Sequence, residues 1–148
     1  MTTTPTAGSR IKAANTPAPY LRSAAASAPV TVNSTTPADL TGATITITTA
    51  NANASVLVIG NFDAQCVTSS GVAVALGTCV VDGSTQTGEA THDQVAVGNR
   101  GCVSQTWNVS LPTAGGHTIK LQGVLSGAAG STTFNATHTT ITALVLDW

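Results

Sequence analysis

The last third of the chain, from Gly116 to Trp148, has the pattern of three strands with polar turns between them. His117, Ile119 and Leu121 fall on one face of an extended segment, and polar residues stand between them. A period of two residues is typical of a half-buried β-strand. A cluster of small turn-forming residues at 126–131 then separates this strand from the next one.

The closing run, 141–148, is apolar on both of its faces. One face of an antiparallel sheet packs on the core, while the other can meet water. The second face of this run carries Leu144, Leu146 and Trp148. We therefore expect these three residues to form a subunit interface. For Trp148, a place in the core of its own chain is an equal alternative.

Similar strand-like runs extend back to residue 29, and no segment has the pattern of an amphipathic helix. Val56–Phe62 is mostly apolar, which predicts a central strand. Asp82 and Gly83 form the strongest hairpin signal in the chain. We count eight to ten short strands over residues 28–148. The pattern predicts an all-β fold, an antiparallel β-sandwich or a barrel.

The composition fits one domain and gives no sign of a polyanionic partner. The chain has 148 residues, of which 7% are charged, and its formal net charge is −1. Average soluble domains have about 25% charged residues. Neither nucleic acid nor membrane is expected as a partner.

Residues 1–27 are expected to form an extended N-terminal arm. The segment is rich in Pro, Ala and Ser and lacks the apolar stretch of a secretion signal, so no secretion is expected. It carries three of the five basic residues, and no acidic residue precedes Asp39. A cationic arm can dock on a neighbouring chain. The alternative is a loose tail without function. The residues expected to make the docking contacts are Arg10, Lys12, Tyr20, Leu21 and Arg22.

The three cysteines, Cys66, Cys79 and Cys102, have no zinc-binding spacing. Each stands in a strand-like run, so we expect buried thiols. A bridge between Cys66 and Cys79 across a hairpin is the alternative.

Candidate catalytic chemistry is sparse. His92 and Asp93 are the one adjacent pair of His and acid, and a nucleophile such as Cys102 would have to join them. We expect His92 to be a solvated surface residue. His117 and His138 could be neighbours across a turn, but a third metal ligand is not near them in sequence. No catalytic, cofactor or metal site is therefore expected, and Trp107 is expected to anchor the core.

Five segments in order, VLVIGNFD, CVVDG, VSQTWNVSL, GHTIKLQ and THTTITALVLD, resemble small jelly-roll proteins of tailed-phage virions. That family is similar to the jelly roll of tumour necrosis factor and includes trimeric head decoration proteins and minor tail or fibre domains. The resemblance covers about residues 29–147. It implies a jelly-roll β-sandwich, a place in the virion and threefold symmetry.

The expected function is therefore that of a non-enzymatic decoration protein. It would bind the major capsid protein on the outer surface of a phage head as a homotrimer, after synthesis in the host cytoplasm. The alternative is a minor tail or fibre-tip protein that recognises a host receptor or glycan. The short chain, without a shaft, favours the first, and the scarcity of aromatic residues, 3%, weighs against the second.

Overall fold

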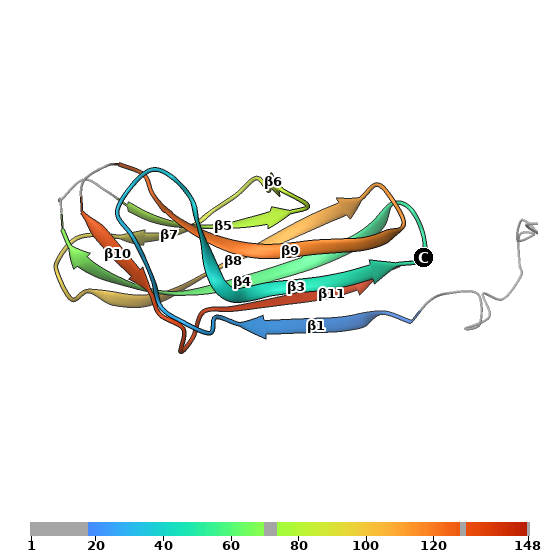
Figure 1. Ribbon diagram of the computed structural model, residues 1–148, viewed down its shortest axis with the longest axis horizontal. Helices are drawn as coiled ribbons and strands as arrows, with labels where there is room; N and C mark the ends of the chain where they lie inside the picture. The colour runs from blue at the N-terminus through green and yellow to red at the C-terminus, as the bar shows by residue number, and fades with distance from the viewer. Residues whose placement is uncertain (1–17, 70–73, 128–129, 148) are drawn as a thin grey trace, which may run out of the picture.

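The computed structural model describes residues 18–69, 74–127 and 130–147, and within them it contains β-strands and no helix (Figure 1). The strands are β1 (Tyr20–Ala25), β2 (Val30–Val32), β3 (Ala38–Thr49), β4 (Ala54–Thr68), β5 (Val74–Val81), β6 (Ser84–Thr85), β7 (Ala90–Asp93), β8 (Arg100–Leu111), β9 (Gly115–Leu125), β10 (Ser131–Phe134) and β11 (Thr140–Leu146). The all-β prediction is confirmed. In the described ranges there is no helix that could cross a membrane.

Two antiparallel sheets pack face to face as a sandwich (Figure 1). The six-stranded sheet has the order β1-β11-β4-β10-β2, with β8 along the other side of β4. The five-stranded sheet has the order β3-β9-β5-β6, and β7 also pairs with β5. The apolar run Val56–Phe62 lies in β4, between β11 and β8. The prediction of a central strand is therefore confirmed.

The core is centred on the ring of Phe62, which meets two other rings edge to face. Its centroid lies 6.4 Å from that of Trp107 and 6.1 Å from that of Phe134. Trp107 is 3% exposed, so its predicted role as a core anchor is confirmed. Gly77 in β5 leaves room for Phe62, because a Cβ at that position would lie 2.6 Å from the ring.

The hairpin predicted at Asp82 and Gly83 joins β5 to β6. Both residues have positive φ angles, 48° and 84°. Two consecutive residues of this kind match the right-handed twist of the flanking strands. The local sequence therefore determines this turn.

Residues 20–25, which the sequence places in the arm, form β1 along the edge of the six-stranded sheet (Figure 1). Tyr20 pairs with Val145 of β11. Its hydroxyl donates to Thr48 O at 2.6 Å and accepts from Thr48 N at 3.1 Å, so it also contacts the edge of the other sheet. Residues 1–17, with Arg10 and Lys12, lie outside the described residues, as does Trp148.

Candidate functional site

Three leucines from three neighbouring strands form a row on the outer face of the six-stranded sheet. Leu21 of β1 lies opposite Leu144 of β11, and Leu144 lies opposite Leu57 of β4. Leu21 is 57% exposed and Leu57 is 36% exposed. Side chains opposite each other in an antiparallel pair are close enough to touch. The row is therefore one continuous apolar strip.

Two more apolar side chains widen this strip. Ile59 follows Leu57 on the same face of β4 and is 37% exposed, and Leu146 follows Leu144 on β11 and is half-buried. The alternate residues of both strands point into the core and are fully buried. We call the resulting surface the outer patch; it consists of Leu21, Leu57, Ile59, Leu144 and Leu146.

The outer patch contains some of the residues that the sequence singled out. Leu144 and Leu146, expected at a subunit interface, lie on the outer face of the sheet. Leu57 and Ile59 were missed, because a mostly apolar run predicts a strand that is buried on both faces.

The described arm residues have different surroundings. Leu21 faces solvent within the outer patch. Tyr20 contacts Thr48 of its own chain. The guanidinium of Arg22 lies 5.1 Å from the centroid of the Tyr20 ring, a cation–π distance. Tyr20 therefore fastens β1 to its own sandwich, whereas the contact of Arg22 with Tyr20 lies within β1 itself.

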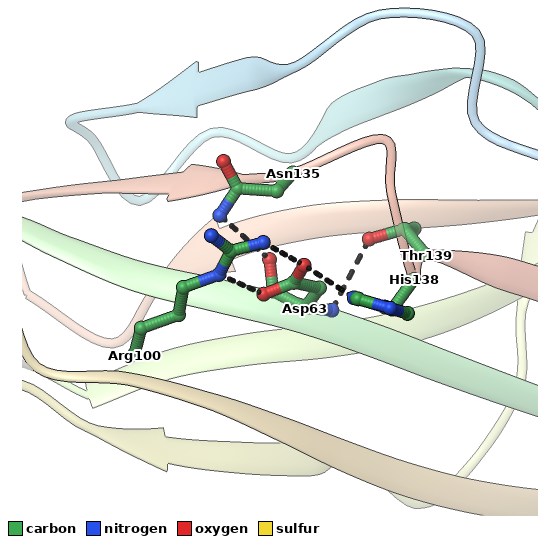
Figure 2. A network of polar contacts seen from close by, with 5 residues as sticks. All are labelled: Asp63, Arg100, Asn135, His138 and Thr139. Carbon is green, nitrogen blue, oxygen red and sulfur yellow. Dashed lines mark hydrogen bonds and ion pairs between the residues drawn. The ribbon is translucent and has the colours of Figure 1, made fainter.

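A polar cluster lies further along β4, around Asp63, which is 0% exposed (Figure 2). Arg100 of β8 donates from Nε to Asp63 Oδ1 at 2.8 Å and from Nη2 to Oδ2 at 2.5 Å. This two-pronged contact is a strong form of ion pair. His138 Nδ1 lies 3.3 Å from Oδ2. The hydrogen bonds from Arg100, assisted by His138, hold the pKa of Asp63 below its usual range despite the desolvation of the carboxylate.

The loop between β10 and β11 is fastened to the backbone of Asp63 (Figure 2). Asn135 donates to Asp63 O from its backbone N at 2.7 Å and from Nδ2 at 3.4 Å. Asp63 N donates to Thr139 Oγ1 at 3.1 Å, and Figure 2 shows this bond and the one from Nδ2. The loop thus has little freedom to move away from β4. It carries His138, which is exposed, to the buried carboxylate.

Cys102 completes a group of three residues with metal-binding side chains. It lies opposite Asp63 in the pairing of β4 with β8 and is exposed. One ligand atom from each of Asp63, Cys102 and His138 lies within 4.8 Å of the other two. Sequence reasoning missed this group, because its members come from three distant segments that only the folded chain brings together.

The expectation that His92 is a solvated surface residue is wrong. His92 is 7% exposed rather than solvated, because Ala90, His92 and Gln94 form the inward face of this segment. Its Nδ1 lies 3.3 Å from Gln94 Nε2, and Asp93 points to the opposite face of β7. The adjacent pair therefore does not form a catalytic unit.

His117 and His138 are not neighbours. His117 lies in β9 of the five-stranded sheet, and its Nδ1 lies 2.7 Å from Asp82 Oδ2. His138 lies in a loop of the other sheet, so the two residues do not flank a common turn.

All three cysteines are free thiols, so the alternative of a Cys66–Cys79 bridge is not realised. The prediction of buried thiols is right for Cys66 and Cys79 and wrong for Cys102. Cys102 alternates outward on β8, where its neighbour across the pair is Asp63.

No family model matches the chain, and no curated protein matches it. Solved structures do match. The VP2 subviral particle of infectious bursal disease virus aligns with a TM-score of 0.57 and 17% identity, over 89% of this chain and 33% of that one. The Gx strain of the same virus gives 0.55 and 17%, over 89% and 33%. Dimeric latent PorU from Porphyromonas gingivalis gives 0.51 and 7%, over 87% and 13%.

These likenesses concern the fold. The chain spans about a third of the length of the viral chains and less of PorU. The shared fold is an antiparallel jelly-roll sandwich, as predicted. A common fold hosts many functions, so the function has to be argued from the surface and its residues.

Proposed function

We propose that the chain is a non-enzymatic structural protein of a virion. In its most specific form, the proposal is a decoration protein that sits as a homotrimer on the outer surface of a phage head and stabilises the head. The major capsid protein would be its partner. The jelly-roll fold, which the chain shares with a viral capsid protein, supports a structural role.

The observation that carries the proposal is the outer patch. Its leucines come from β1, β11 and β4 and lie side by side on one sheet face. Burial of apolar surface stabilises an association by about 25 cal/mol per Å². A contiguous apolar strip on a chain with so few charged residues is therefore a suitable subunit contact.

The positions of the aromatic residues argue against the alternative, a receptor-binding tail or fibre tip. Phe62, Trp107 and Phe134 are buried in the core, and Tyr20 lies in β1. The loops within the described ranges therefore carry no Phe, Tyr or Trp side chain on which a sugar ring could stack. Binding of host cell-wall glycans by the isolated protein would favour the tail hypothesis instead.

The mass in solution tests the proposed subunit contact. We expect a particle of three times the 14.7 kDa chain mass by light scattering. Leu57→Lys and Leu144→Lys should shift the protein toward the monomer, because each buries a charge in the contact. Thr46→Lys adds the same charge on the exposed face of β3 and serves as the matched control. A wild-type monomer, or a trimer unaffected by both leucine variants, would contradict the proposal.

The pairing of β1 with β11 determines which deletion can test the arm. Deletion of residues 1–27 would remove β1 and leave the edge of β11 uncovered. Deletion of residues 1–17 leaves the described strands intact. We expect this shorter deletion to weaken co-sedimentation with phage heads that lack the protein, while the trimer mass persists. Full binding after this deletion would exclude residues 1–17 as a docking element.

A further inference from the structure

We propose that Asp63, Cys102 and His138 form a binding site for a thiophilic divalent cation, and Zn²⁺ is the ion that fits these ligands best. The site lies on the same outer face of β4 as the outer patch but beyond Asn61, so the inference does not depend on self-association.

The spacing of the three side chains suits a tetrahedral ion. Zinc bonds to sulfur, nitrogen and oxygen of about 2.0–2.3 Å place the ligand atoms of a tetrahedron roughly 3.3–3.6 Å apart. His138 Nδ1 and Asp63 Oδ2 are 3.3 Å apart, which is already one edge of such a tetrahedron. The group as a whole spans no more than 4.8 Å. Because Cys102 is exposed, a rotation of its side chain can close the remaining gap.

The positions of the ligands are largely set before an ion arrives. Cys102 lies directly across from Asp63 in the sheet. His138 is brought close by the loop, which Asn135 and Thr139 fasten to the backbone of Asp63. Little conformational entropy therefore has to be lost when an ion binds, which favours binding.

The ligand types select the class of ion. A thiolate, an imidazole and a carboxylate together suit Zn²⁺, whereas Mg²⁺ and Ca²⁺ prefer oxygen ligands alone. Three protein ligands leave one coordination position of a tetrahedral ion open. Since Cys102 and His138 are both exposed, that position faces solvent and would hold water.

The guanidinium of Arg100 competes with a cation for the carboxylate of Asp63. It occupies both oxygens of Asp63, so a cation has to displace it from at least one of them. The side chain of Arg100 is 44% exposed and can move into solvent. The geometry therefore makes a specific prediction: removal of the positive charge at position 100 should tighten the binding of the cation.

The test is a titration of the purified full chain, under reducing conditions, with Co²⁺ as a spectroscopic substitute, followed by competition with Zn²⁺. We expect one equivalent to bind with a thiolate-to-cobalt charge-transfer band. Cys102→Ser should abolish the band. His138→Ala should lower the affinity for Zn²⁺ by more than the ~10–100-fold that loss of an outer-shell partner costs. Arg100→Gln should raise the affinity.

Asp93→Asn, a change of an exposed carboxylate on β7, is the control and should bind like the wild type. Cys102 and His138 are both exposed, and circular dichroism would verify that their variants fold. A wild-type protein without the charge-transfer band, or a band that persists in Cys102→Ser, overturns the proposal. An affinity that does not rise in Arg100→Gln overturns the assignment of Asp63 as a ligand.

Discussion

His117 Nδ1 lies 2.7 Å from Asp82 Oδ2, and this contact ties the inward face of β9 to the turn between β5 and β6. The other ring nitrogen, Nε2, lies 3.0 Å from Thr113 O. Both nitrogens therefore face acceptors, and only the protonated ring can donate to both. The hydrogen bond to Asp82 is the main reason that the pKa of His117 is raised, against the effect of desolvation.

This pair predicts a dependence of stability on pH. Because the folded pKa of His117 is raised, its contribution is complete below the ordinary value of about 6.5 and disappears as the pH rises through the folded pKa. The pKa of Asp82 is lowered, chiefly by His117, so its contribution is present above about 3.9 and disappears as the pH falls through the folded pKa. We expect the urea midpoint to be lower at pH 8 than at pH 6.

Asp82→Asn should remove most of that difference between pH 6 and pH 8. Asparagine tolerates the positive φ of this position, so the turn should persist. Asp39→Asn changes a carboxylate that binds Lys120 and not a histidine, and it should keep the difference. An unchanged pH profile in Asp82→Asn would assign the effect to another group.

Gly77→Ala should destabilise the protein strongly. The added Cβ would lie 2.6 Å from the ring of Phe62, which two other rings hold in place. Overpacking of a core costs about 1–3 kcal/mol. Gly116→Ala is the matched control, since nothing lies within 4 Å of its added Cβ. Chemical denaturation of the two variants would show the difference, and equal stabilities would contradict the close packing of Gly77 against Phe62.

Tyr20→Phe should weaken the attachment of β1. It removes the hydroxyl that bonds to both Thr48 O and Thr48 N. We expect a loss of about 1 kcal/mol in unfolding free energy, because water can replace part of what is lost at an exposed position. Hydrogen exchange should be faster in β1 of the variant. Ser23→Ala, on an exposed position of the same strand, should leave both quantities unchanged.

Thiol modification should distinguish the three cysteines. Burial raises the pKa of Cys79 to about 12, so its thiolate is scarce at neutral pH. Cys66 is also buried, and Cys102 is exposed. Iodoacetamide should therefore modify one thiol per native chain, at Cys102, and three after denaturation. Rapid modification of Cys79 in the native protein would contradict its burial.

The parts of the fold that the sequence predicts are the local ones. Alternation identifies the inward residues of β9, and Asp82 with Gly83 identifies a turn, because each signal lies within a few adjacent residues. The outer patch and the cluster at Asp63 depend on which strands pair and in which register. Leu21 and Leu144 are far apart in the chain, as are Asp63 and Cys102, and no local pattern states that they are neighbours.

His92 shows a second reason why the sequence does not predict every buried residue. Its segment alternates, but most residues around it are polar, so the pattern does not say which face is inward. The face of β7 that contains His92 is turned toward the six-stranded sheet, where the imidazole lies close to Gly101 of β8 and is buried. The polarity of one segment is thus a weak guide to the burial of its side chains, because the elements packed against the segment determine that burial.

The hydroxyl of Tyr20 has a consequence for how copies of the chain can join. β3 lies at one edge of its sheet. The unpaired N–H and C=O groups of an uncovered edge can hydrogen-bond to a strand of another chain. At Thr48 the phenol already satisfies the N–H and C=O that an added strand would need. Strand addition is therefore blocked at this point of the β3 edge.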